Sequence, residues 1–323
     1  KTLVELVYQI CTKRPSARVL VCALSNSAAD VLTLRLTATS MGKSSNLIRL
    51  YSHTRKPYQV ANEIQPFTFM TAQGEYGVPP TAQLSNYRIV VSTCNNTASL
   101  FGKILPGHFT HIIIDEAAQL LEADALIPLT FATRSTTVVM AGDPQQLQFR
   151  SQSNAAALKV LSLSIMQRLH VLPQYIYVTK DGKVRPNPDH FVHLNENFRS
   201  HPAILKFASE QFYGGSLVPR VDVQQLPPLG LWENISNEDH PMAFLPVQGV
   251  EQCEDDSPSF FNELEATSVT LLVQSLLQDP CAKGLKQNEI GIISPFFKQT
   301  KRIRDMLRMV GCSDVQVSSI ADL

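Results

Sequence analysis

Two adjacent carboxylates at the end of an apolar run have the clearest chemical capacity in this sequence. Asp115 and Glu116 directly follow the run "HIII", which begins at His111. Asp115 could hold a Mg²⁺ ion while Glu116 polarises a water for attack on a γ-phosphate. Acidic residues are also favoured at the start of a helix by the helix dipole. The pair alone therefore leaves phosphate chemistry and helix capping both open.

Two further polar residues follow other apolar runs. Gln146 lies in "AGDPQQL" (Ala141–Leu147) and could reach toward the same phosphate. Arg199 lies in "NENFRSHP" (Asn195–Pro202), and its guanidinium could approach a γ-phosphate from a second domain. A Gly-Asp turn is also common between a strand and a helix, and a surface arginine commonly forms a salt bridge. Each residue by itself thus fits a structural role as well.

The order of the apolar runs predicts the scaffold that would position these residues. Their continuous apolar character is typical of strands buried on both faces of a parallel sheet. Strands alternating with helices indicate a doubly wound α/β fold, in which ligands bind beyond the carboxyl ends of the strands. Helical spacing of apolar residues predicts helices over Thr2–Thr12 and Phe297–Val310. The predicted strands are Arg18–Cys22, Arg88–Thr93, His111–Asp115, Thr136–Asp143, His190–Leu194, Ile290–Ser294 and Val315–Ile320.

Three segments depart from this alternation. Residues 51–86 are rich in Pro, Gln, Thr and Tyr and are predicted to form an insertion. Residues 174–189 contain a D-G turn signal between short β-like runs, which predicts a hairpin. Residues 218–259 are Pro-rich and turn acidic at Glu254–Asp256, which predicts a loop-dominated segment with one edge strand. The first and last thirds of the chain could be two copies of one α/β architecture.

The composition is that of a folded protein of about two domains. Lys and Arg number 28 and Asp and Glu number 28, so the zero net charge gives no global argument for nucleic-acid binding. A local basic groove stays compatible with that total, because the field in a cleft depends on nearby charges. The six cysteines include no C-x-x-C pair, which favours reduced thiols over disulfides or a metal site. Because no apolar run approaches about 18 residues, no membrane span is expected.

Six motifs occur in a fixed order, and the ordered set resembles superfamily 1 helicases of the up-frameshift type. Within these, the branch that contains Armitage and the helicase with zinc finger is the nearest, because "SPSFFNELEA" (Ser257–Ala266) resembles a segment particular to it. The resemblance covers nearly the whole chain. The motifs are "SNSAADVL" (Ser25–Leu32), "VVSTCNNTA" (Val90–Ala98), "IIIDEAAQ" (Ile112–Gln119), "AGDPQQL" (Ala141–Leu147), "NENFRSHP" (Asn195–Pro202) and "IGIISPFFKQ" (Ile290–Gln299).

This resemblance implies two RecA-like lobes in tandem, each built on a parallel sheet. The first would span residues 1–189 and carry the insertion at 51–86 and the hairpin at 174–189. The second would span residues 190–323 and be incomplete at its C-terminus. There, "VQVSSIADL" resembles the start of a motif that continues with Gln-Gly-x-Glu.

The resemblance also gives a meaning to the first two residues. Lys1 and Thr2 look like the end of a phosphate-binding loop of the form G-x-x-x-x-G-K-[ST]. In such loops the lysine neutralises phosphate charge, the hydroxyl joins the Mg²⁺ shell, and the following helix adds its dipole. The glycines of the loop would precede residue 1. We therefore expect a fragment of a longer ATPase that binds ATP poorly and is inactive by itself.

The family roles carry over onto matching positions, with ATP and Mg²⁺ as the implied cofactors. Nucleotide binding is expected from Lys1, Thr2, Phe296 (adenine) and Glu265 (ribose), and Mg²⁺ binding from Thr2 and Asp115. Catalysis is expected from Glu116 as the base, Asp115 as the metal carboxylate, and Gln146 and Arg199 as sensors of the γ-phosphate. Hydroxyls, amides and backbone donors at strand ends suit a phosphodiester backbone, which they hold without reading bases. The implied nucleic-acid face consists of Ser25, Asn26, Thr93, Ser294, Pro295 and Ser318.

Two positions depart from the family pattern. No proline follows Gln146 closely, where the family usually has one, and Phe149 stands nearby. Tyr is more usual than Phe296, so stacking would survive without a phenol hydrogen bond. One basic cluster stays open to two interpretations, a path for the nucleic-acid backbone or a solvated helix face; it comprises Lys298, Lys301, Arg302, Arg304 and Arg308.

The resulting hypothesis is an ATP-dependent helicase or translocase core that moves 5′-to-3′ on single-stranded RNA. A DNA helicase of the same superfamily is one alternative, and a nucleic-acid-binding scaffold without ATPase activity is another. The intact set of Asp115, Glu116, Gln146 and Arg199 argues against the scaffold. Protein partners in RNA decay or silencing complexes are expected, and no membrane. The expected location is the cytoplasm, including ribonucleoprotein granules, and a nuclear location stays open.

Overall fold

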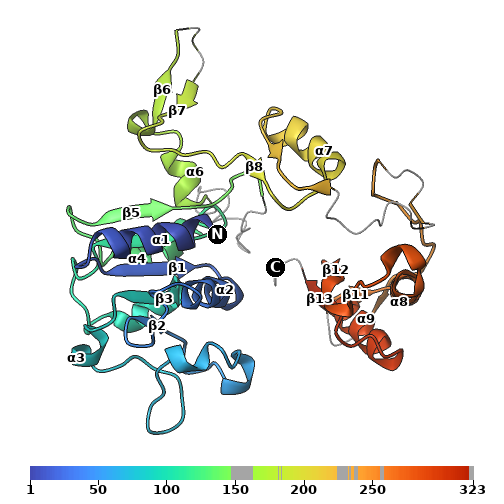
Figure 1. The fold of residues 1–323 in the computed structure, drawn as a ribbon, viewed down its shortest axis with the longest axis horizontal. Coiled ribbons are helices and arrows are strands. Elements are labelled where there is room, and N and C mark those ends of the chain that lie inside the picture. The colour runs from blue at the N-terminus through green and yellow to red at the C-terminus, as the bar shows by residue number, and fades with distance from the viewer. Residues whose placement is uncertain are drawn as a thin grey trace. The chain divides into compact units, whose positions relative to one another are not determined.

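The computed structural model describes residues 1–146, 163–180, 182, 184–223, 232, 234–235, 239–254 and 258–319. The chain divides into two units, Lys1–Val192 and His193–Leu323, and each has its own α/β structure (Figure 1). Phe149 and the residues after Ser319, which entered the sequence predictions, lie outside the described residues.

Unit 1 is built around a five-stranded parallel sheet in the order β2-β3-β1-β4-β5. The four strands predicted within this unit are confirmed. Three of them, β1, β3 and β4, are buried almost throughout, as long apolar runs predict, whereas Thr137 and Val138 of β5 are exposed. The edge strand β2 was not predicted, since its three residues are too short to form a recognisable run. The strands are β1 (Val19–Ala23), β2 (Leu47–Arg49), β3 (Ile89–Thr93), β4 (His111–Ile114) and β5 (Thr137–Met140).

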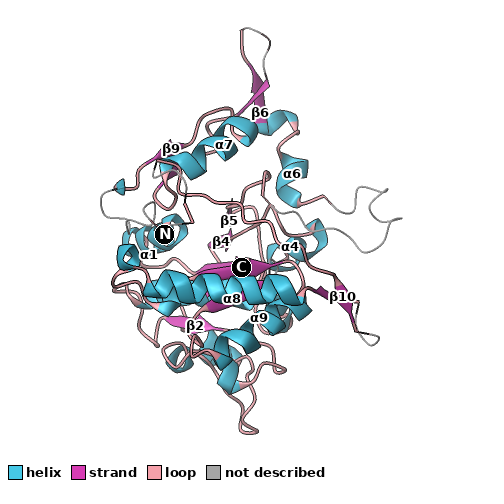
Figure 2. Cartoon of the chain, turned by 90° about the vertical axis from the view of Figure 1, so that its right-hand side faces the viewer, coloured by secondary structure: helices cyan, strands magenta, loops and turns pink. Residues whose placement is uncertain are grey.

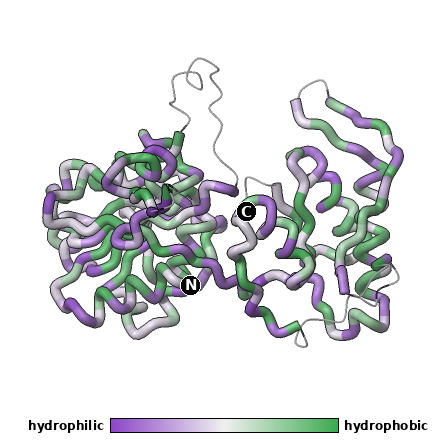
Figure 3. Tube along the Cα trace, turned by 90° about the horizontal axis from the view of Figure 1, so that it is seen from above, coloured by the Kyte–Doolittle hydropathy of each residue, from purple (hydrophilic) through white to green (hydrophobic). Residues whose placement is uncertain are grey.

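Helices cover both faces of this sheet, as expected for a doubly wound fold. Val19 and Val21 of β1 pack in the core that includes α1 (Thr2–Lys13) and α2 (Asn26–Thr37). Leu20, on the opposite face, packs in a second core. All five residues of β1 are accordingly buried, and hydrophobic and hydrophilic stretches alternate along the trace of the chain (Figure 3). The second core includes residues of α3 (Thr81–Leu84), α4 (Glu122–Leu129) and α6 (Ile165–Leu169).

The segments predicted as an insertion and a hairpin lie outside the five-stranded sheet. Residues 51–86 form short 3₁₀ turns, helix α3 and a small core of their own, which comprises Tyr51, Val60, Ile64 and Tyr76. β6 (Ile176–Val178) and β7 (Val184–Pro186) pair antiparallel, and Gly182 between them has φ +77°. A positive φ at this turn is available to glycine without strain.

Unit 2 contains a parallel pair of strands, β12 (Gly291–Ser294) and β13 (Gln316–Ser319). Helices α8 (Glu263–Gln278) and α9 (Phe297–Met309) lie side by side (Figure 2) and share an apolar core with β13. The unit also contains the helix α7 (Pro202–Phe212) and four short strands, which are β8 (Glu196–Asn197), β9 (Val218–Pro219), β10 (Gln252–Cys253) and β11 (Phe260–Phe261).

The predicted strand over His190–Leu194 is wrong. Asn187 begins a turn, since its side chain accepts the Asp189 amide at 3.1 Å and its carbonyl accepts the His190 amide at 3.0 Å. Val192 is 86% exposed, so the apolar residues of this run are not buried against a sheet. Pairing starts later, where β8 lies parallel to β9. A local Asn turn therefore overrides the apolar pattern here.

The described part of the chain bears on the expected membrane spans and on the state of the cysteines. No helix there combines the length and the apolar character needed to cross a bilayer. All six cysteines lie within it and are free thiols.

The central position of β4 predicts a large stability effect. Ile113 is fully buried between β1 and β5, so Ile113→Ala should lower the free energy of unfolding by about 2–5 kcal/mol. Urea denaturation followed by circular dichroism measures this change. The matched control is Leu105→Ala, because Leu105 is 79% exposed and should change stability by less than about 0.5 kcal/mol. Equal losses in the two variants would contradict the described burial.

Candidate functional site

The carboxyl edge of the five-stranded sheet brings the predicted residues of unit 1 to one place. Ala23 of β1 pairs with Thr93 of β3, and Cys22 pairs with Ile114 of β4. Ile114 in turn pairs with Met140 of β5. The segments that follow these positions leave the sheet at the same edge, where ligands bind in doubly wound folds. They carry Ser25, Asn26, Thr93, Asp115, Glu116 and Gln146.

Asp115 and Glu116 form the turn directly after β4. Glu116 has φ +54°, the one positive φ among the described residues other than glycine. This conformation is strained for a residue with a side chain, and such strain is concentrated at functional sites. Two hydrogen bonds hold it: the Glu116 amide donates to Asp115 Oδ1 at 3.1 Å, and Gln119 Nε2 donates to Glu116 Oε2 at 3.1 Å. The turn thus fixes the orientation of the predicted base.

The turn after β5 packs directly on the turn after β4. A Cβ atom at Gly142 would lie 2.6 Å from the Ala118 amide nitrogen, so only glycine fits without a backbone shift. The Ala117 amide also donates to the Ala141 carbonyl at 2.8 Å. Gln146 Nε2 donates to Asp143 Oδ2 at 2.9 Å, which holds this exposed side chain at the same edge. The glycine of "AGDPQQL" is therefore a requirement of packing between the two turns.

The electrostatics at this edge favour a cation. Burial raises the pKa of the Asp115 carboxyl above its ordinary value, while the hydrogen bond from the Glu116 amide and the positive charge of Arg35 partly oppose the shift. Burial also raises the pKa of Glu116, and the charges of Asp115 and Asp143 raise it further. Ionising these carboxylates is therefore unfavourable unless a positive charge joins them.

The residues present fit a magnesium ion held together with phosphates. α1 begins at Thr2 with exposed Lys1 as its N-cap, and no side chain caps its first turn, so these backbone amides suit a phosphate. The α-amino nitrogen of Lys1 lies close enough to Asp115 for an electrostatic interaction, so the start of α1 and the turn after β4 lie at the same edge of the sheet. Mg²⁺ usually takes one or two carboxylates plus phosphate oxygens. The described residues contain no cluster of three or more His, Cys, Asp or Glu that could hold a metal ion by itself.

The predicted nucleic-acid residues of unit 1 cap the turns in which they lie. Ser25 Oγ accepts the Ala28 amide at 3.1 Å and is the N-cap of α2. Thr93 Oγ1 accepts the Asn96 amide at 3.3 Å. Asn26 Oδ1 is directed inward, where it accepts a hydrogen bond from a guanidinium. The hydroxyls are half-buried and the loops that carry them share one edge of the sheet.

In unit 2, the predicted residues fall at the carboxyl ends of β12 and β13. Ile293 pairs with Ser318 and Ser294 with Ser319, so Ser294 and Ser318 belong to adjacent strand ends. Pro295 follows and is exposed. Phe296 packs edge-on against Phe260, with ring centroids 6.0 Å apart. The exposed Glu265 lies in the first turn of α8, where Asn262 Oδ1 accepts its amide at 3.2 Å.

Arg199 lies in the loop between β8 and α7. Asn197 Oδ1 accepts the amides of Arg199 and Ser200 at 3.0 and 2.8 Å, which orders the loop, and the Arg199 side chain is exposed. Its approach to the carboxylates of unit 1 stays a prediction, as do the roles of Phe296 and Glu265.

Four of the five basic residues of α9 form contacts within unit 2, and the fifth, Lys301, is exposed. Lys298 forms an ion pair with Glu254, and Arg302 Nη2 lies 2.7 Å from Glu263 Oε1. Arg308 pairs with Asp305, and Arg304 Nη2 donates to the Val317 carbonyl at 2.6 Å. This pattern favours the solvated, ion-paired face over a path for the nucleic-acid backbone.

Sequence reasoning missed two candidates. Phe198, immediately before Arg199, is 69% exposed, and an exposed ring can stack on a base. Arg49 is fully buried at the end of β2 and contacts both Asn26 and Asp30. The signal for Arg49 was present, since an arginine within the apolar run "LIRL" (Leu47–Leu50) indicates a buried charge that needs partners.

The half-buried carboxylate of Glu116 predicts a pH-dependent stability penalty. Because the folded-state pKa lies above the ordinary 4.5, stability falls as the pH rises through that value and the penalty is complete above the folded-state pKa. Glu116→Gln should therefore raise the thermal midpoint at about pH 8, and by less at about pH 4. Differential scanning calorimetry without nucleotide or Mg²⁺ measures both. A midpoint that is unchanged or lower at the higher pH would contradict this.

Comparison with known proteins places this chain in a family. Two models described as "AAA domain" match this chain, one at residues 1–76 and 73–149 and the other at residues 162–323. Human "RNA helicase Mov10l1" is 33% identical over 328 residues, which cover 99% of this chain and 26% of the relative. "Probable RNA helicase armi" of Drosophila melanogaster is 30% identical over 341 residues, which cover 94% of this chain and 28% of the relative.

Human "Probable helicase with zinc finger domain" is 31% identical over 330 residues, which cover 100% of this chain and 16% of the relative. The chain thus spans less than a third of the length of each of these relatives. With the ordered motifs and the parallel sheet that carries them, these matches show that the chain belongs to the superfamily 1 helicases of the up-frameshift type, near the branch of Armitage and the helicase with zinc finger.

Proposed function

We propose that the protein containing this chain is an ATP-dependent RNA helicase or translocase that moves 5′-to-3′ on single-stranded RNA. ATP hydrolysis would be coupled to closing and reopening of two lobes, corresponding to residues 1–189 and 190–323. The observation that carries the proposal is the strained Glu116, held beside Asp115 at the carboxyl edge of the sheet. A strained acidic turn is costly to retain unless it serves chemistry.

The geometry supports a division of labour between the two carboxylates. Burial and neighbouring negative charge raise the pKa of Glu116, which makes it a better acceptor for the proton of an attacking water. Asp115, Thr2 and the amides of α1 would hold Mg²⁺ and the phosphates, and the ion would supply charge neutralisation at the transferred phosphate. Gln146, tied to Asp143, would orient the same phosphate or the water. Arg199 would add its charge from the second lobe.

RNA is the proposed substrate on two grounds. Hydroxyls and loop amides at strand ends suit a sugar–phosphate backbone, and Ser25 and Thr93 lie at one such edge. Two of the relatives carry the printed name of an RNA helicase. We also propose partners in RNA decay or silencing complexes and a cytoplasmic location, which co-purification and fluorescence microscopy of the full-length protein would test.

The deciding experiment measures ATP turnover by the full-length protein with and without single-stranded RNA. We expect RNA to stimulate turnover, and Glu116→Gln to lower the stimulated rate by at least about 100-fold, because a positioned general base contributes that much. Glu122→Gln is the matched control, since Glu122 lies in the same unit but forms an ion pair with Arg168. It should leave turnover unchanged.

Each part of the proposal has its own contrary result. A wild-type rate that RNA does not raise above that of Glu116→Gln would favour a scaffold without ATPase activity. Stronger stimulation by DNA than by RNA of matched sequence would favour a DNA helicase. Duplexes with a single-stranded overhang at either the 5′ or the 3′ end test the direction of movement. Preferential unwinding from the 3′ overhang would contradict the proposed 5′-to-3′ direction.

A further inference from the structure

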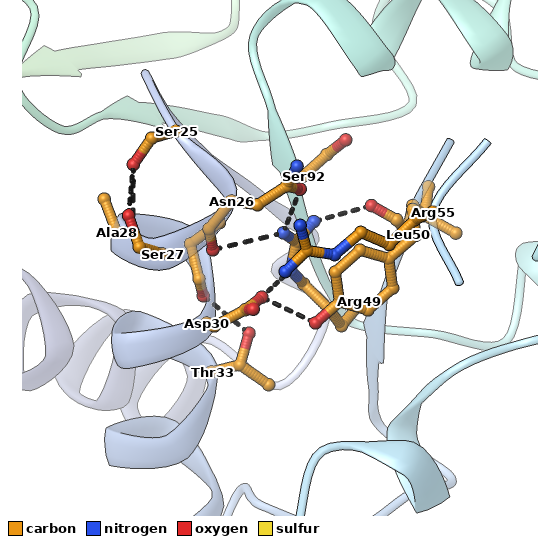
Figure 4. A network of polar contacts seen from close by, with 12 residues as sticks. Ser25, Asn26, Ser27, Ala28, Asp30, Thr33, Arg49, Leu50, Arg55 and Ser92 are labelled. Carbon is orange, nitrogen blue, oxygen red and sulfur yellow. Dashed lines mark hydrogen bonds and ion pairs between the residues drawn. The ribbon is translucent and has the colours of Figure 1, made fainter. Parts of the chain in front are cut away.

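A fully buried arginine lies beneath the predicted nucleic-acid loops of unit 1. Arg49 is the last residue of β2, and its side chain has no exposed surface. Its Nε donates to Asp30 Oδ1 at 2.9 Å, its Nη2 to Asn26 Oδ1 at 2.8 Å, and its Nη1 to the Leu50 carbonyl at 2.6 Å (Figure 4). The planar guanidinium thus uses three nitrogens on three different acceptors, a geometry that a lysine ammonium does not match.

The first loop that Arg49 holds in place is the start of α2. Asn26 and Asp30 are four residues apart, so they lie on the same face of the helix. By bonding to both, Arg49 fixes the first turn of α2 against the end of β2. Ser25 is the N-cap of that turn. The orientation of the Ser25–Asn26 segment is therefore tied to one buried cation.

The second loop is tied to the same cation through a shared acceptor. Asn96 Nδ2 donates to the Leu50 carbonyl at 3.1 Å, the carbonyl that also accepts from Arg49, and to Ser92 Oγ at 3.2 Å. The Asn96 amide donates to Thr93 Oγ1 at 3.3 Å. The loop after β3 and the start of α2 thus meet at one hydrogen-bonded centre.

The insertion completes the burial of this centre. Tyr51 Oη donates to Asp30 Oδ1 at 2.6 Å, and its ring lies 4.0 Å from the Arg49 guanidinium carbon. Tyr51 also packs on Tyr76, with ring centroids 5.0 Å apart. Burial raises the pKa of the Tyr51 hydroxyl, which therefore stays a neutral donor. A buried ion pair gives little net stability, and its best-attested use is to select one arrangement of the groups around it.

We propose that Arg49 is a positioning residue for nucleic-acid binding, which holds the Ser25–Asn26 and Thr93–Asn96 loops in one fixed arrangement without touching the nucleic acid. This inference rests on the proposed function, because it assigns those loops to a phosphodiester backbone. In this proposal Asn26 helps to hold the loop through its hydrogen bond to Arg49, and Ser25 and Thr93 are the residues that face the nucleic acid.

The test uses the full-length protein and a fluorescently labelled oligouridylate, with affinity measured by anisotropy over a range of salt concentrations. Arg49→Met should weaken RNA binding about tenfold. Arg49→Lys should bind RNA as weakly, because the planar guanidinium with its several N–H donors is required and a positive charge alone is not sufficient. The slope of log affinity against log salt should stay as in the wild type. A residue in direct contact with a phosphate of a single strand would lower that slope by about 0.7 when removed.

Two further variants separate positioning from folding. Arg49→Met combined with Asp30→Leu removes both charges, so it leaves no unpaired buried ion and should fold, yet should still bind RNA about tenfold more weakly. Arg88→Met is the matched control. Arg88 lies at the opposite edge of the sheet and donates to the carbonyls of Cys11 and Arg14 at 2.8 and 3.0 Å, so its loss should lower the thermal midpoint but not RNA affinity.

The outcomes that overturn the inference are distinct. Wild-type affinity in the double variant, or full rescue by Arg49→Lys, would show that the network does not position the loops. A lowered salt slope would show that Arg49 touches the phosphates itself. Equal loss of affinity in Arg88→Met would reduce the effect to general destabilisation. Absence of binding by the wild-type protein would overturn the proposed function, and this inference with it.

Discussion

Backbone pairing in the parallel sheet of unit 1 decides where its candidate residues lie. Parallel strands end at a common edge, and the pairs Ala23–Thr93, Cys22–Ile114 and Ile114–Met140 align four of them there. The loops that follow are far apart in sequence, yet they start within one to three strand spacings of each other. A shift of register by one residue would direct every side chain to the other face. The two apolar layers of helices prevent such a shift.

Close contact between two backbone turns then shapes the candidate site at this edge of the sheet. Gly142 lets the turn after β5 rest on the amides of the turn after β4, and Glu116 takes a left-handed conformation within the latter. The same compact turn buries the carboxylates, which raises the pKa of Asp115 and of Glu116. Strain, burial and like charge all oppose folding here. Their coexistence is explained if a bound cation and phosphates offset them.

A second polar centre serves the other end of the same edge. Arg49, Asp30 and Asn26 form it under the start of α2, at a depth where the neighbouring residues Leu47, Ile48 and Leu50 are apolar and buried. In the proposed function an external cation would offset the negative charge of the acidic site, whereas Arg49 supplies the positive charge of this second centre itself. This difference in charge fits the two proposed roles, which are ATP hydrolysis at the acidic site and positioning of the binding loops by Arg49.

The sequence by itself determined four of the five strands of the first sheet, because long apolar runs between two helical layers leave few other structures, and its ordered motifs determined the family. It predicted His190–Leu194 wrongly, since the turn at Asn187 is a local polar effect that hydrophobicity does not record. Only the tertiary structure revealed the strain at Glu116, the contact at Gly142 and the partners of Arg49. The reason is physical: φ angles, close approaches and the partners of a buried charge arise when distant segments are packed together, and no single segment encodes them.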